Sequence, residues 1–154
     1  MPKISFIIPT FNESKNLPLL LSDLSLFRDF AEIIVVDCKS KDKTKDISYI
    51  YGAKLYNLKE KNRGLQLNFG AKKANNEWFF FIHADSRLNR DFFRQIEFIL
   101  KADKKNYIYY FKLKINNRKL EYRFLEFFVN FRSYFFKNPY GDQGLIIHRE
   151  AYFK

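Results

Sequence analysis

Uninterrupted apolar runs recur along the chain and are the main signal for its strands. Runs without polar alternation are typical of strands buried on both faces, as in parallel sheets. They predict strands at Lys3–Pro9, Glu32–Asp37 and Trp78–Ile82, a weaker strand at Ala53–Leu58 and a short last one at Leu145–His148. Partial alternation and β-branched or aromatic residues favour a further strand at Tyr107–Ile115.

Between these runs, apolar residues recur every three or four positions, which is the spacing of amphipathic helices. The spacing predicts helices at about 17–27, 44–51, 64–74, 89–102 and 119–136. An alternation of strands and helices predicts an α/β fold with a mostly parallel sheet, flanked by helices and joined by right-handed crossovers. No linker interrupts the pattern, so we expect residues 1–154 to form a single domain.

Composition narrows the class of protein. With 47% hydrophobic and 19% aromatic residues, the chain is not disordered. Cys38 is its one cysteine, which excludes an internal disulfide and fits a reducing compartment. The apolar stretch after Lys3 is too short and too early for a signal peptide, and no run approaches the ~20 residues of a membrane span. We therefore expect a cytoplasmic protein.

The charge is strongly basic and unevenly spread. The formal net charge is +11, and residues 101–137 hold ten Lys or Arg against three Asp or Glu. Such a region suits nucleic acid, an anionic membrane surface or a phosphorylated substrate. A nucleic-acid-binding module would explain the charge but not why buried strands end in carboxylates, so nucleic acid is not the expected partner.

Polar residues gather where three of the predicted strands end. Asp37 and Asp85 follow two of them, and Thr10 to Glu13 follow the first. Parallel strands end at one edge, where open α/β folds bind ligands. Asp85 there could bind a divalent cation that holds a diphosphate, or it could cap the next helix. The loop 37–44 suits a nucleoside, but an ordinary solvated loop would look similar.

A second candidate ligand contact precedes the helix at 64–74. Arg63 and Gly64 stand at its start, where free N–H groups and a guanidinium suit an anion such as a diphosphate. An ordinary exposed helix start is the alternative. The sequence lacks both G-x-G-x-x-G and G-x-x-x-x-G-K-[ST], so the common dinucleotide and NTPase motifs are absent.

Taken together, these segments resemble a known family. In order they read Pro9-x-x-Asn12-Glu13, Asp37-x-x-Ser40-x-Asp42-x-Thr44, Arg63-Gly64-x-Gln66-x-Asn68-x-Gly70-Ala71, His83-Ala84-Asp85 and Gly141-Asp142-Gln143-Gly144. This order looks like a family-2 glycosyltransferase with the GT-A, Rossmann-like fold. It is most similar to a subgroup with His-Ala-Asp in place of Asp-x-Asp. The resemblance runs from Lys3 to Phe153.

The resemblance implies a nucleotide-sugar donor and roles for individual residues. Pro9, Thr10 and Glu13 would line the nucleotide pocket, Asp37 would contact the base with Ser40 nearby, and Arg63 would face the diphosphate. Asp85 would bind Mg²⁺ or Mn²⁺, with Ala84 beside it in the same site. His83 replaces a motif carboxylate, and it is either a second metal ligand, a hydrogen-bond partner of the sugar or a packing residue.

The family inverts the anomeric centre, which requires a carboxylate base near the acceptor. Its Glu-Asp pair normally lies downstream of Gly-Asp-Gln-Gly, so we expect that residues 1–154 lack the C-terminal part of the domain, bind the donor and transfer sugar poorly. A non-catalytic nucleotide-sugar binder is the alternative function. Asp142 is the candidate base within the chain, although a turn residue beside glycine is the plainer interpretation. The acceptor, a glycan or a lipid-linked molecule, is not identified by the sequence.

The helix predicted at 119–136 is apolar on two sides. Leu120, Phe124, Phe128, Phe131 and Phe135 share one side, and Tyr122, Leu125, Val129 and Phe136 share another. One domain core can cover only one of them. We therefore expect an aromatic, basic surface for a membrane or a partner, with burial by a second copy or by further chain as the alternative.

Overall fold

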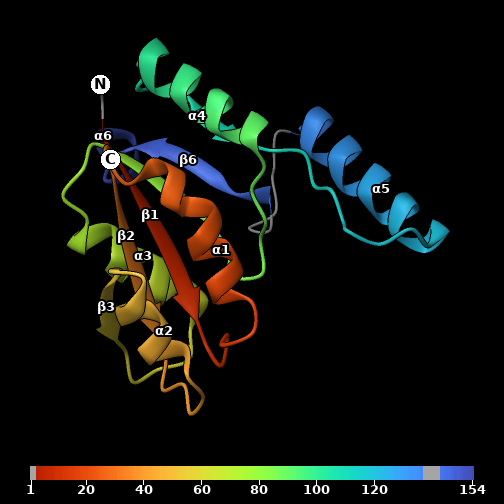
Figure 1. Cartoon of the computed structure of the whole chain (residues 1–154). Helices are drawn as coiled ribbons and strands as arrows, with labels where there is room; N and C mark the ends of the chain where they lie inside the picture. Colours follow the sequence, from red (N-terminus) through yellow and green to blue (C-terminus); the bar gives the residue numbers. More distant parts are fainter. Residues whose placement is uncertain (1–2, 137–142) are drawn as a thin grey trace.

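The computed structural model describes residues 3–136 and 143–154, and its centre is a six-stranded sheet (Figure 1). The strands are β1 (Ile4–Thr10), β2 (Ala31–Asp37), β3 (Lys54–Asn57), β4 (Trp78–Phe81), β5 (Ile108–Tyr110) and β6 (Leu145–His148). They lie in the order β3-β2-β1-β4-β6-β5. β1 to β4 are mutually parallel, and β6 is antiparallel to both of its neighbours. The predicted α/β fold with a mostly parallel sheet is confirmed.

Helices cover both faces of the sheet. They are α1 (Leu17–Leu24), α2 (Thr44–Ile50), α3 (Arg63–Lys73), α4 (Arg90–Ala102), α5 (Leu120–Phe136) and α6 (Arg149–Tyr152), with a 3₁₀ turn η1 (Ser25–Phe27) after α1. Side chains of α1, α2 and α4 pack into one apolar cluster, and those of α3 and α6 pack into a second. None of the helices in the described ranges is long and apolar enough to cross a membrane.

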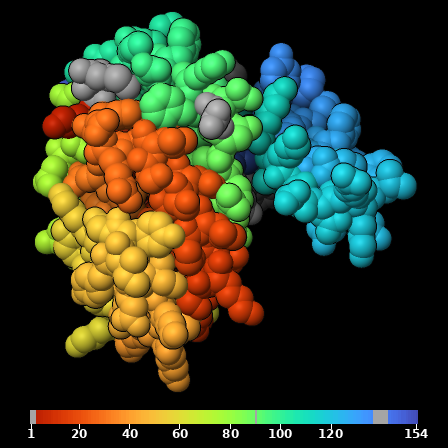
Figure 2. All heavy atoms as spheres, in the orientation of Figure 1, coloured from red at the N-terminus to blue at the C-terminus, as the bar shows by residue number. Residues whose placement is uncertain are grey.

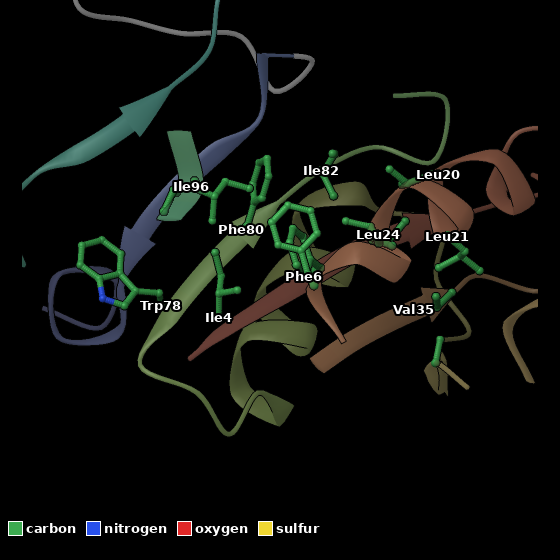
Figure 3. Packing of buried hydrophobic residues seen from close by; sticks show 14 of the residues in the cluster. Ile4, Phe6, Leu20, Leu21, Leu24, Val35, Trp78, Phe80, Ile82 and Ile96 are labelled. Atoms are coloured by element: carbon green, nitrogen blue, oxygen red, sulfur yellow. The ribbon is translucent and has the colours of Figure 1, made fainter. Parts of the chain in front are cut away.

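The central strand β1 shows why its sequence lacks polar alternation. Ile4, Phe6 and Ile8 face the α1 side, where Figure 3 shows Phe6 beside Leu24 of α1 and Ile4 near Trp78 and Phe80. Ile7 faces the α3 side, and all seven residues of β1 are buried. Both faces therefore need apolar residues, which is the usual condition of a parallel strand between two helical layers.

Close packing of α3 on the sheet depends on a small residue. A Cβ placed on Gly70 would collide with the Ile7 side chain and lie 3.2 Å from Cγ2 of Val36. Ala71 and Ala74 are also buried on this face. The small residues let the α3 backbone approach β1 and β2, and they thereby fix where the first turn of α3 lies.

One predicted strand is shorter than expected. The strand predicted at Tyr107–Ile115 contains only β5, and residues 111–117 run as extended chain beside α5. Backbone groups of Leu113 and Ile115 bond to side chains of Asn130 and Glu126 on α5 instead of to a strand. These partners lie on a different element, so local β propensity gave no sign of them.

Replacing Gly70 by alanine should destabilise the fold by about 1–3 kcal/mol, because the added methyl overpacks the contact with Ile7 and Val36. Urea unfolding followed by fluorescence of Trp78, the one tryptophan, measures this. Gly64→Ala is the matched control, since a Cβ there meets only Asn62 Oδ1 at 3.4 Å. Equal midpoints for both variants and the parent would contradict the packing argument.

Candidate functional site

The carboxyl ends of β1 and β2 are joined around one buried carboxylate. Thr10 and Asp37 are opposite each other in the register, and Asp37 is completely buried. Its Oδ1 accepts a hydrogen bond from Thr10 Oγ1 at 3.0 Å, and its Oδ2 accepts one from Ser40 N at 3.0 Å. Ser40 Oγ also donates to Asp37, and Lys45 Nζ lies 3.9 Å from Oδ2. The charge is thus held by donors from both strand ends.

Gln66 ties the same junction to α3. Its side chain is buried, and Nε2 donates to the carbonyl oxygens of Thr10 at 3.0 Å and Val36 at 2.7 Å. Sequence reasoning placed Gln66 only within a motif and gave it no role. The available signal was a long polar side chain in the first turn of a helix whose inner face is otherwise small.

The loops after β1 and β2 are bonded to each other. Asn12 has a φ of 56°, a left-handed conformation that asparagine tolerates better than most residues. Its N donates to Ser40 Oγ at 2.7 Å, and its Oδ1 accepts from Lys41 N at 2.8 Å. Glu13 N donates to Thr44 Oγ1 at 2.8 Å. The two loops therefore form one rigid rim at the sheet edge.

Asp42 completes this rim. It accepts hydrogen bonds from Ser14 N at 2.9 Å, Thr44 N at 3.1 Å and Thr44 Oγ1 at 2.5 Å. Partial burial alone would raise the Asp42 pKa, but the hydrogen bonds from Thr44 and Ser14 outweigh it and lower the pKa to about 2. The carboxylate is therefore ionised at neutral pH.

The chain after β4 reaches the same edge. Ile82 N donates to Ile7 O at 3.2 Å, which continues the pairing with β1 past the end of β4. His83 and Ala84 follow and are buried, whereas Asp85 is exposed. A bond from Ser86 N to His83 O at 3.1 Å closes the turn. The predicted convergence of three strand ends on one edge is observed.

An ion pair fixes this turn to α1. Arg87 donates twice to Asp23, at 2.7 and 3.0 Å, and Leu88 N donates to the same carboxylate at 3.0 Å. Burial alone would raise the Asp23 pKa, but the hydrogen bonds from Arg87 and the Leu88 N–H outweigh burial, so the pKa lies below its ordinary value. The exposed carboxylate of Asp85 thus stands on an anchored loop.

The start of α3 lies beside an exposed ring. Asn62 caps the helix by accepting from Leu65 N at 3.1 Å, and Arg63, its first residue, is exposed. Lys61 Nζ lies 3.8 Å from the ring centroid of Phe11, whose side chain is 38% exposed. Sequence reasoning missed Phe11 and Lys61. The available signal for Phe11 was its position as an aromatic residue directly after the end of a buried strand.

The remaining predicted residues have different settings. Pro9 is buried within β1, and Glu13 is half-buried with its carboxylate accepting from Asn16 Nδ2 at 3.0 Å. Asp142, the candidate base, lies outside the described residues. Gln143 beside it is buried, donates to Phe111 O at 3.1 Å and accepts from Ser133 Oγ at 2.7 Å. Gln143 therefore connects this motif to α5.

Among the residues that the structure describes, few metal-binding side chains gather at the sheet edge. The described residues contain no group of three or more His, Cys, Asp or Glu side chains able to hold a metal. Mg²⁺ at phosphate sites commonly takes one or two carboxylates and completes its shell with water and substrate phosphate. An exposed Asp85 fits that kind of site. A ligand role for His83 stays a prediction.

A separate groove of about 500 Å³ lies where β2 and β3 begin, at the opposite edge of the sheet. It is lined by Leu24, Phe27, Arg28, Ala31, Glu32, Ile33, Ile50, Tyr51, Gly52 and Lys54. None of the motif residues contributes to it.

Sequence comparison finds relatives that are named as glycosyltransferases. A 4,4'-diaponeurosporenoate glycosyltransferase of Staphylococcus haemolyticus is 38% identical over 57% of this chain and 25% of its own length. An uncharacterized glycosyltransferase of Rickettsia typhi is 32% identical over 77% of this chain and 38% of its own length. The chain therefore spans well under half of these relatives.

Solved structures share the fold. Staphylococcus aureus TarS in complex with UDP-GlcNAc superposes with a TM-score of 0.67 and 26% identity, over 77% of this chain and 36% of that one. A mannosyltransferase from Pyrobaculum calidifontis with GDP-Man and Mn²⁺ has a TM-score of 0.71 at 18% identity, over 97% and 45%, and supports the GT-A fold alone. The model of Glycosyl transferase family 2 matches residues 5–153. With that match, the resemblance drawn from the motifs is confirmed: the chain belongs to glycosyl transferase family 2.

Proposed function

We propose that this chain transfers a sugar from a nucleotide-diphosphate donor to a glycan or lipid-linked acceptor. The observation that carries the proposal is the joining of Thr10, Asp37 and Ser40 at the sheet edge where the exposed Asp85 emerges. A rigid polar rim next to an exposed carboxylate suits a nucleoside joined to a metal-bound diphosphate. Family membership supports it, as does the TarS complex with UDP-GlcNAc.

The nucleoside is proposed to bind over the loops after β1 and β2. Pro9, Thr10 and Glu13 belong to one wall, and Asp37 and Ser40 belong to the other. The half-exposed ring of Phe11 offers a flat surface on which a nucleobase can stack. Asp37 is buried and bonded on both oxygens, so its first role is to hold the walls together. Direct contact between Asp37 and the base stays a prediction.

The diphosphate is proposed to lie between α3 and the turn after β4. Arg63 is exposed at the first position of α3, where backbone N–H groups and the helix dipole favour an anion. Asp85, with Ala84 beside it and His83 behind it, would hold Mn²⁺ or Mg²⁺ against the phosphate oxygens. When bound, the cation neutralises charge on the leaving diphosphate.

Inversion at the anomeric carbon is proposed for the transfer step. The acceptor hydroxyl attacks from the side opposite the diphosphate, its proton passes to a carboxylate, and the bond from the anomeric carbon to the diphosphate oxygen breaks. Asp142 is the candidate base in this chain. Its neighbour Gln143 is held by Phe111 and Ser133, so the position of Gln143 before β6 is fixed.

A cytoplasmic setting at the inner face of a membrane is part of the proposal. The buried thiol of Cys38, the one cysteine, suits a reducing compartment. Nucleotide-sugars are anionic, and the net charge of +11 favours their approach.

Asp85→Ala should abolish the Mn²⁺-dependent part of nucleotide binding and leave the fold intact, because the exposed side chain makes the proposed metal contact. Calorimetry with UDP and GDP, with and without Mn²⁺, measures both parts. Asp29→Ala, which removes an exposed carboxylate just before β2 at the other edge, is the control. Unchanged metal-dependent affinity for Asp85→Ala would remove Asp85 from the site.

Asp37→Ala should weaken nucleotide binding even without metal, because buried donors from both walls of the proposed pocket lose their common acceptor. Thr10 Oγ1 and Ser40 N would lose their partner, and the walls of the pocket would separate. The same calorimetry without Mn²⁺ tests it. Binding as tight as that of the parent would show that the pocket does not depend on this junction.

The rim should also make stability depend on pH. The Asp42 pKa is lowered to about 2 from 3.8, so its contribution is complete above about pH 4 and is lost as the pH falls through about 2. Asp42→Asn should therefore be less stable than the parent at pH 7, and the gap should close between pH 4 and 2. Thermal unfolding at each pH measures the gap, with Asp29→Asn as control. A gap independent of pH would contradict this.

If Asp142 is the base, Asp142→Asn should lower the transfer rate by about 10²–10⁴-fold without changing donor affinity. Donor turnover with a supplied acceptor and calorimetry with the donor separate the two effects. Full transfer by the variant would exclude Asp142 as the base, and weaker donor binding would place it at the donor sugar instead.

A further inference from the structure

The helix α5 turns its polar side chains toward the protein. Asn130 accepts from Leu113 N at 2.8 Å and donates to Leu113 O at 3.0 Å. Tyr110 Oη donates to Ser133 O at 2.7 Å, while Ser133 Oγ bonds to Gln143. These polar residues hold α5 against the extended segment that follows β5.

Two charged residues continue this polar face by one further turn. Glu126 accepts from Ile115 N, and Arg123 donates to the carbonyl oxygens of Ile115 and Asn117 at 2.6 Å each. Arg123 and Glu126 also pair with each other at 2.8 Å. Arg123, Glu126, Asn130 and Ser133 are spaced three or four residues apart, so they form one stripe along the helix. The charges of this stripe are therefore paired with each other and with the backbone of the segment that follows β5.

The opposite side of α5 is aromatic and exposed. Its side chains are 46–76% exposed. They are Leu120, Phe124, Phe127, Phe128, Phe131, Tyr134 and Phe135. Their ring contacts run along the helix itself, with centroids 6.0 Å apart for Phe127 and Phe131 and 4.4 Å apart for Phe131 and Phe135. We call these seven residues the aromatic face.

The aromatic face belongs to a helix that stands apart from the sheet. Figures 1 and 2 show α5 projecting from the body, joined to it through the segment after β5. Within α5 only Val129 and Ser133 are buried. An amphipathic helix of a lone globular domain normally has the reverse polarity, with apolar residues inward. Large contiguous exposed apolar patches mark interaction sites.

Charge decides which occupant suits this face. Lys112, Lys114, Arg118 and Lys119 are exposed on the segment that runs beside α5. Residues 101–137 carry ten basic and three acidic side chains in all. A second copy docking by the same face would bring these like charges together, which is unfavourable. An anionic lipid surface supplies both apolar depth for the rings and negative charge for the lysines.

We propose that α5 lies in the surface of an anionic membrane, with the aromatic face in the boundary between headgroups and acyl chains. Lys112, Lys114, Arg118 and Lys119 contact the lipid phosphates. The inward stripe from Arg123 to Ser133 keeps the helix folded on the protein while its other side is in lipid. This docking does not depend on sugar transfer, so the two can be tested separately.

Flotation of the 154-residue chain with vesicles tests the proposal. Phosphatidylcholine vesicles with phosphatidylglycerol should carry the protein upward at low salt, less at high salt, and far less without phosphatidylglycerol. The triple variant Phe124→Gln, Phe128→Gln, Phe135→Gln should lower the partition coefficient by more than about tenfold, because three rings leave the lipid. Phe98→Gln on α4, 74% exposed in the parent, is the matched control and should float like the parent.

Fluorescence of the buried Trp78 shows whether each variant is folded. A second variant, Lys112→Gln with Lys114→Gln and Lys119→Gln, should lose the preference for anionic lipid while it keeps the rings. No flotation at low salt, or equal flotation of the parent and the folded triple variant, would overturn the proposal. Sedimentation velocity tests the other occupant, a second copy of the chain. If the parent dimerises, the triple variant does not, and vesicles do not bind, then a second copy covers the aromatic face and the proposal is overturned.

Discussion

The buried carboxylate of Asp37 is the constraint on which the proposed site depends. A charge without water costs several kcal/mol unless donors surround it. Thr10 on β1 and Ser40 after β2 supply those donors, so the charge is stable only when both strand ends are in register. Gln66 donates to the carbonyl oxygens of Thr10 and Val36 beside them and thereby brings α3 to the same point. One polar junction thus positions three elements inside an apolar sheet.

The shape of the site follows from this junction. With the strand ends fixed, Asn12 and Asp42 can bond the two following loops into one rim. The parallel pairing of β4 with β1 then brings the turn containing Asp85 to that rim, where the ion pair of Asp23 and Arg87 holds it. A rigid rim, a helix start and an exposed carboxylate together suit a donor with a base, a diphosphate and a metal.

The sequence was sufficient for those features that local patterns determine. Continuous apolar runs located β1, β2 and β4, and residues following them located the sheet edge, because burial and chain direction are properties of short segments. Gln66 was not recognised because its partners lie 56 and 30 residues away. Residues 111–115 were predicted as strand for the same reason, since side chains of Asn130 and Glu126 on α5 supply the partners of Leu113 and Ile115. An exposed apolar side of α5 was expected from its apolar residues on two sides. Leu125 and Phe136 of the second side are exposed as well, and of that side only Val129 is buried.

The carboxyl edge of the sheet is proposed to bind a nucleotide, and hydrogen–deuterium exchange measures this binding directly. Adding UDP and Mn²⁺ should slow exchange of backbone amides at residues 10–14, 38–44 and 62–66 and in the turn 83–87. Amides around the groove at the other edge, such as those near Phe27 and Tyr51, should be unaffected. Protection confined to that groove, or no protection at saturating nucleotide, would contradict the account.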